Sequence, residues 1–133
     1  MARNEKWHYT FSRRLPCCYL FYPMSNAPYQ LILCTCPNSD IAEQLASRLV
    51  EQRLAACINI VPGLTSIYRW QGKVEKDMEV LLLIKTTQDR YGAVESAIQQ
   101  HHPYELPEII AVTVDEGSSD YLRWITSSLE EVS

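Results

Sequence analysis

Residues 30–61 read QLILCTCPNSDIAEQLASRLVEQRLAACINIV, and this stretch decides the fold. It begins with a short, nearly continuous apolar run, Gln30–Thr35, which is typical of a strand covered on at least one face. Pro37 ends that run, and apolar residues at helical spacing predict a helix from about Asp40 to Gln52. Strand composition returns at Ala56–Val61. The stretch therefore predicts a strand, a helix and a second strand in succession.

The rest of the chain continues this alternation. Pro62-Gly63 predicts a bulge or break, because Thr65–Trp70 resumes strand composition, and Gln71-Gly72-Lys73 is a hairpin signal. The further expected elements are a third strand around Met78–Lys85, a helix ending near Gln100, a fourth strand over Glu108–Val114 and a last helix carrying Leu122, Ile125 and Leu129.

Helix starts are also suggested by the local sequence. Asn38, Ser39 and Asp40 are all residue types that cap the start of a helix, and Asp40 with Glu43 can form a capping pair. Thr86 and Thr87 are residue types that can cap the second helix.

The resulting order is β-α-β-β-α-β with one more helix at the C-terminal end. This order predicts an α+β fold of the ferredoxin-like split βαβ type, an antiparallel four-stranded sheet with two helices on one face. The other face still carries apolar side chains from the third strand. It therefore needs a cover, which is either the last helix or another subunit.

Composition excludes several classes of protein. The chain has 133 residues, 47% hydrophobic and 21% charged, which suits one globular domain. A formal net charge of −4 disfavours a nucleic-acid binder, and no apolar run approaches the roughly 20 residues of a membrane-spanning helix. The four glycines lie too far apart for a phosphate-binding loop, a dinucleotide fingerprint or a nucleophile elbow.

Residues 1–23 differ in composition from the rest, holding four basic residues, one acid and two of the five cysteines. Their basic start and short apolar run imitate a signal peptide, but Pro16 and Pro23 interrupt the run. We interpret Met24 as the natural start. Residues 1–23 are then an upstream start or a disordered extension, and 24–133 a single domain.

Cysteine and histidine are the residues most able to carry chemistry. Period two puts Cys34 and Cys36 on one face of the first strand, where they could hold a soft ion or simply fill core space. Cys57 is expected to be a buried structural thiol. His101 and His102 precede a proline, and the pair favours either a copper, nickel or zinc site or a helix C-terminus.

Two further groups of side chains have expected surroundings. Most of the aromatic residues are expected in the core or at an interface. Lys85 is expected to be solvated unless it meets a carboxylate or an anionic ligand. The aromatics in question are Tyr68, Trp70, Tyr104, Tyr121 and Trp124.

The strings LILCTCPNSDIAEQLASRLVEQRLAACINIVPGLTSIYRWQGKVE, EVLLLIKTT, HHPYELPEIIAVTV and DYLRWI resemble the divalent-cation tolerance proteins (CutA) from about Leu31 to Leu129. The resemblance implies a cytoplasmic protein without established enzymatic activity, connected with tolerance of copper and other divalent metal ions. It implies a ferredoxin-like fold assembled as a tight homotrimer that resembles the PII signalling proteins. It also implies copper ligands at Cys34, His101 and His102. Cys36 and residues 1–23 lie outside the pattern and inherit no role.

Three functional hypotheses follow. The first is a homotrimer that binds copper or other divalent metal ions. The second is a PII-like signalling scaffold that takes a small anionic metabolite in an intersubunit cleft near Cys34, Lys85 and His102. The third, an enzyme using a thiol and an imidazole, lacks an identifiable oxyanion donor. In a trimer, the long hairpin Tyr68–Val80 is expected to pair with a neighbouring subunit. Whether the cysteine and the histidines meet within one chain or between chains stays open.

Overall fold

The computed structural model describes residues 28–131. The interpretation of residues 1–23 as an extension falls outside this part of the chain, so the division at residue 24 stays a prediction.

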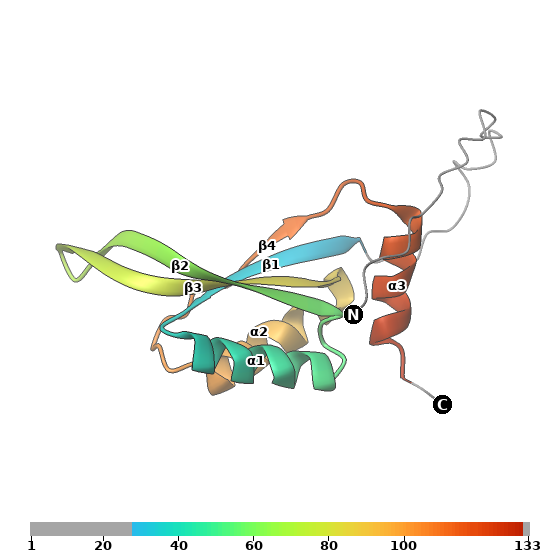
Figure 1. Ribbon diagram of the computed structural model, residues 1–133, viewed down its shortest axis with the longest axis horizontal. Helices are drawn as coiled ribbons and strands as arrows, with labels where there is room; N and C mark the ends of the chain where they lie inside the picture. Colours follow the sequence, from blue (N-terminus) through green and yellow to red (C-terminus); the bar gives the residue numbers. More distant parts are fainter. Residues whose placement is uncertain (1–27, 132–133) are drawn as a thin grey trace.

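The structure is an α+β fold built on one antiparallel sheet, as the sequence predicts. The strand order is β2-β3-β1-β4, so β1 lies between β3 and β4. Helices α1 and α2 lie side by side under one face, and α3 stands at one end of the sheet (Figure 1). The elements are β1 (Tyr29–Cys36), α1 (Ser39–Glu51), β2 (Cys57–Trp70), β3 (Lys73–Thr87), the 3₁₀ turn η2 (Gln88–Arg90), α2 (Tyr91–His101), β4 (Ile110–Thr113) and α3 (Ser119–Leu129).

The core lies between the sheet and the pair of helices. Every second residue of β1 and β3 points into it, as the period of two predicts. Helix α1 contributes three further fully or almost fully buried side chains, and α2 contributes two. The central members of this core are Ile32, Cys34, Cys36, Leu82, Ile84, Ala42, Leu45, Leu49, Val94 and Ile98.

The opposite face of the sheet is apolar but only partly covered. Leu33 pairs with Leu83 on one side and with Ile110 on the other, and Ile110 and Val112 of β4 are each 51% exposed. Helix α3 covers one end of this face, where Ile125 and Leu129 form a small cluster. The expected cover is therefore only partly supplied by the last helix within one chain.

The β2–β3 hairpin is longer than the helix layer and projects beyond it (Figure 1). The predicted bulge is confirmed between Val61 and Leu64, and β2 continues through it as one strand. The predicted turn is also confirmed, with Gln71 at φ 50° and Gly72 at φ 80°. Positive φ at both central residues is the pattern of a type I′ turn, which matches the twist of a hairpin.

The cap of α1 is one of the three candidate residues named from the sequence. The cap is Asn38, whose side-chain oxygen accepts a 2.9 Å hydrogen bond from the Ile41 backbone N–H. The predicted Asp40–Glu43 capping pair is therefore wrong, because the helix already begins at Ser39 and places Asp40 in its first turn. The prediction is thus confirmed at Asn38, which lies directly before the first helical residue.

The start of α2 differs from the prediction. Strand β3 continues through Thr87, and η2 separates it from α2. Neither predicted threonine caps a helix through its side chain: the Thr86 hydroxyl donates a 2.7 Å hydrogen bond to the Leu54 carbonyl, and the Thr87 hydroxyl donates to the carboxylate of Asp89. Pairing with β1 extends the strand beyond the point where the apolar alternation ends.

The five aromatic residues noted above are not core residues of the single chain. Each is between 36% and 40% exposed in the single chain. Of the two expected positions, core or interface, the interface is the one left, and it stays a prediction. Within residues 28–131, no helix is long and apolar enough to cross a membrane.

Candidate metal centre

The two cysteines of β1 lie on the core side of the sheet. Cys34 and Cys36 are both completely buried, and their paired residues on β3 are Leu82 and Val80. Thr35 stands between them with its side chain on the opposite face. The strand thus presents two sulfur atoms in the same direction, as its period of two predicts.

The imidazole of His102 approaches these sulfurs from the segment that follows α2. His102 is the C-cap of this helix, in extended conformation, and is 7% exposed. Its Nε2 lies 2.7 Å from the Thr35 carbonyl oxygen, and its Nδ1 accepts a 3.1 Å hydrogen bond from the Tyr104 backbone N–H. Because a backbone N–H can only donate, Nδ1 is the acceptor and the ring proton sits on Nε2. His102 is therefore a neutral imidazole that ties the segment after α2 to β1.

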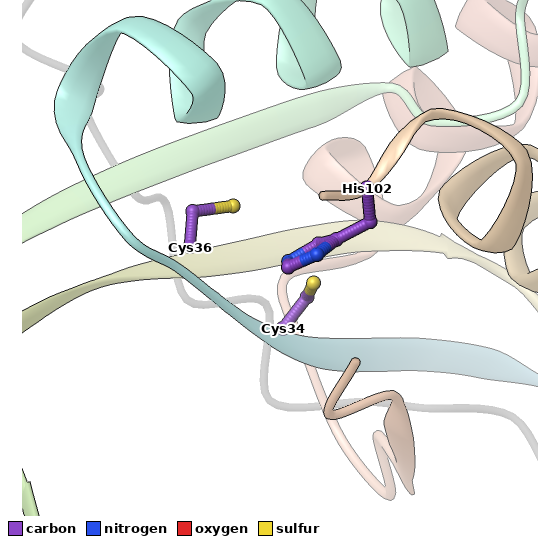
Figure 2. A group of neighbouring side chains, drawn as sticks. All are labelled: Cys34, Cys36 and His102. Atoms are coloured by element: carbon purple, nitrogen blue, oxygen red, sulfur yellow. The ribbon is translucent and has the colours of Figure 1, made fainter. Parts of the chain in front are cut away.

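These three side chains form one compact cluster. One ligand atom each from Cys34, Cys36 and His102 all lie within 4.8 Å of one another, and all three residues are buried. Figure 2 shows both sulfur atoms and the imidazole ring converging on the space between β1 and the chain that leaves α2. In the part of the chain that the structure describes, this is the one group of metal-ligating side chains so arranged.

The sulfur and imidazole donors of this cluster are of the kind that copper prefers. Thiolate and imidazole are ligands that copper accepts well, whereas magnesium and calcium prefer oxygen. Cys34 and His102 of the predicted ligand set lie together, but His101 does not join them. His101 is exposed at the end of α2, where it lines a hollow with Gln44, Arg48 and Pro103.

Cys36 takes the third position in the cluster. The signal for it was the two-residue spacing from Cys34, which puts both sulfurs on one face. Family resemblance assigns it no role, so it stood outside the predicted ligand set.

Electrostatics distinguish the two thiols. The hydrogen bond with Cys36, together with burial, raises the pKa of Cys34 above its usual value. The interaction with Cys34 lowers the pKa of Cys36, while the Cys34 thiol donates a 3.8 Å hydrogen bond to the Thr35 carbonyl oxygen.

A tyrosine and a carboxylate border the cluster. The Tyr104 hydroxyl donates a 3.1 Å hydrogen bond to Oε2 of Glu79, which is 8% exposed. The ring of Tyr104 lies 4.7 Å from that of His102, centroid to centroid. Burial, followed by the Glu79 hydrogen bond, raises the pKa of Tyr104. A neutral phenol thus stands between the buried carboxylate and the imidazole.

Lys85 and Cys57 lie away from this cluster. The Lys85 Nζ is 3.3 Å from the Tyr121 hydroxyl, on the face of the sheet opposite to Cys34. A cleft shared by Cys34, Lys85 and His102 is therefore not formed within one chain, because neighbouring strand residues alternate between faces. Cys57 pairs with Lys85 on that same opposite face and is half-buried, so its expected burial in the core is wrong.

Comparison with known proteins identifies the family. Residues 30–128 match the model described as CutA1 divalent ion tolerance protein. The chain is 50% identical over 96 residues to the divalent-cation tolerance protein CutA of Thermus thermophilus, covering 72% of this chain and 93% of that protein. It is 46% identical over 99 residues to protein CutA of Homo sapiens, covering 74% of this chain but only 55% of the human protein.

A solved structure gives the same assignment. The crystal structure of CutA from Xylella fastidiosa superposes with a TM-score of 0.76 at 45% identity, covering 77% of this chain and 99% of that one. The relatives share both the sequence pattern and the arrangement of strands and helices, and this chain belongs to the CutA1 divalent ion tolerance family.

Proposed function

We propose that this protein is a cytoplasmic homotrimer that binds copper and other divalent metal ions and takes part in the response to them. The proposed ligands are Cys34, His102 and His101, and the proposed role is not catalytic. The observation that carries the proposal is the buried approach of the Cys34 sulfur to the His102 imidazole from segments far apart in the sequence. The relatives' names connect the family with divalent-cation tolerance.

Chemistry favours copper within this class of ions. A soft thiolate and an imidazole are ligands for copper and zinc, and first-row affinities peak at copper. Cys34 and His102 would hold the ion, which is itself the cargo of a tolerance protein. His101, exposed on the end of α2, would reach the ion only if the segment around Pro103 rearranged. His101 is therefore the member of the proposed set with the least support.

The proposed trimer is supported by the uncovered face of the sheet. Ile110 and Val112 are half-exposed there, and the projecting hairpin exposes Ile67 and Val74 by 68% and 67%. Apolar surface of this kind, next to an unpaired strand edge, favours burial against another copy. The cytoplasmic location rests on the thiols of Cys34, Cys36 and Cys57, which are all free in the described residues.

The alternative of a PII-like scaffold has one observation in its favour. Lys85 is half-buried on the open face, and in the described residues it meets the Tyr121 hydroxyl and ring but no carboxylate. A cation placed there could face a small anionic metabolite in a cleft between subunits. That cleft would lie on the opposite side of the sheet from the cysteines.

The test of the metal proposal is calorimetric titration of copper into the full-length protein. Wild type is expected to bind copper, and Cys34→Ala and His102→Ala are each expected to lose at least tenfold in affinity. Mutating a residue that only hydrogen-bonds to a metal ligand already lowers metal affinity roughly 10–100-fold, so losing a ligand should cost at least as much. Native mass spectrometry checks that the variants keep the assembly of the wild type. If both variants bind copper like wild type in that assembly, the site lies elsewhere.

A further inference from the structure

We propose that Cys36 completes, with Cys34 and His102, a three-donor site for monovalent copper within a single chain. This inference rests on the proposed metal-binding function and changes its ligand set, because Cys36 takes the place of His101. The observation behind it is the buried cluster in which each of these three side chains offers one ligand atom within 4.8 Å of the other two.

The geometry of the cluster suits one shared ion. A metal–sulfur bond of about 2.3 Å puts two sulfurs on the same ion at most about 4.6 Å apart. The present separations of up to 4.8 Å therefore need only small side-chain rotations. Because Cys34 and Cys36 both belong to β1, the paired strands hold the distance between their Cα atoms, so the site is largely preformed.

The number and kind of donors favour Cu(I) over the divalent ions. Both cysteines are fully buried and His102 nearly so, so the protein supplies three donors and solvent has little access for more. Zinc sites normally complete four ligands, and calcium and magnesium need six or more oxygens. Soft sulfur ligands select Cu(I), which is satisfied by two or three donors.

Loading the site exchanges protons for the ion without electron transfer. Cu(I) forms bonds to the two sulfurs, and the two thiol protons pass to solvent, which leaves one net negative charge on the centre. His102 joins less readily than the cysteines. Both of its ring nitrogens are already hydrogen-bonded, to the Thr35 carbonyl and to the Tyr104 N–H, and one of these bonds must open. The two thiolates should therefore dominate the affinity.

The test is anaerobic competition for Cu(I) between the full-length protein and a coloured Cu(I) chelator. Cys34→Ser and Cys36→Ser are each expected to weaken Cu(I) binding about 100-fold or more, and His102→Asn about tenfold. The scale for these values is the roughly 10–100-fold loss of metal affinity that follows mutation of a residue hydrogen-bonded to a metal ligand. Cys57→Ser is the matched control, since its thiol lies on the other face of the sheet and should leave the affinity unchanged.

X-ray absorption at the copper edge supplies a second readout. Wild type should show two sulfurs and one nitrogen around copper, and Cys36→Ser one sulfur fewer. Because Cys36 is a core residue, thermal unfolding of the metal-free variants checks their folding, and Cys36→Ala serves if the serine variant does not fold.

The outcomes separate this inference from the broader proposal. If Cys36→Ser binds Cu(I) like wild type while Cys34→Ser and His102→Asn lose it, the three-donor site is wrong and the proposed function stands. If none of the variants loses Cu(I), this site and the proposed ligands both fail. Displacement of bound Cu(I) by equimolar Zn²⁺ would overturn the choice of ion.

Discussion

Two hydrogen bonds from a tyrosine to a carboxylate lie in different environments in residues 28–131. Tyr104 donates a hydrogen bond to Glu79 beside the metal-ligating cluster, and Tyr68 donates one to Asp77 on the projecting hairpin. Glu79 is 8% exposed, whereas Asp77 is an exposed residue. The Asp77 hydrogen bond raises the pKa of Tyr68 to about 12. The environment should decide how much each hydrogen bond matters for folding.

Tyr104→Phe is expected to lower the free energy of unfolding by about 1–3 kcal/mol. The change removes the one hydrogen bond that the Glu79 side chain makes among the described residues and leaves a buried carboxylate unpaired. Urea unfolding followed by circular dichroism measures the effect.

Tyr68→Phe is the matched control for this change. It also deletes a phenol–carboxylate hydrogen bond, but Asp77 stays solvated, so the unfolding midpoint should not move. Equal effects of the two variants would mean that burial of Glu79 is not what makes its hydrogen bond important.

At the scale of the elements, two glycines both have room for a side chain, but only one of them has a backbone conformation that disfavours a residue with a Cβ. A Cβ added at Gly72 or at Gly92 would meet no heavy atom within 4 Å. Gly72 has φ 80° in the β2–β3 turn, whereas Gly92 lies in α2 with ordinary helical geometry. Any difference between alanine substitutions at these positions therefore comes from the backbone.

Gly72→Ala is expected to destabilise the protein by about 1–2 kcal/mol, the cost of left-handed backbone for a residue with a Cβ. Gly92→Ala is expected to stabilise it by about 0.4–1 kcal/mol, because alanine has less backbone freedom to lose on folding. Thermal unfolding of both variants measures the signs. Destabilisation by Gly92→Ala would show that this position has a contact outside the single chain.

At the scale of the whole molecule, the partly uncovered face of the sheet is the surface that a free chain would expose and an assembled chain would bury. Helix α3 stands at one end of the sheet (Figure 1) and covers that end of the face. Ile110 and Val112 of β4 are half-exposed. Residues 28–131 contain no further element that covers them. A proposed trimer would cover this partly apolar face and would also give the long, projecting hairpin a neighbouring subunit to pack on.

Ile110→Glu is expected to shift the proposed trimer to monomer, since a carboxylate buried in an apolar interface has no partner. Val50→Glu is the matched control: Val50 is 41% exposed on α1, against 51% for Ile110, and it lies in the helix layer. Native mass spectrometry reads the assembly of both variants. A monomeric wild type, or a trimeric Ile110→Glu variant, would contradict this assignment of the interface.

Local pattern predicted most of the architecture. The alternation of periods two and 3.6 predicted the order of the elements, and the glycine after Gln71 predicted the hairpin turn that the structure contains. Period two likewise predicted that Cys34 and Cys36 share a face. These features depend on residues a few positions apart, so the sequence by itself carries the information.

Contacts between distant segments were decided only by the tertiary structure. Which of two adjacent histidines reaches the sulfurs depends on how the chain leaves α2 and packs on β1, a contact between His102 and Thr35 across 67 positions. The same holds for Lys85, whose face is set by the pairing of β3 with β1. Local periodicity orients a side chain within its own element, but only the packing of one element on another determines which side chains meet.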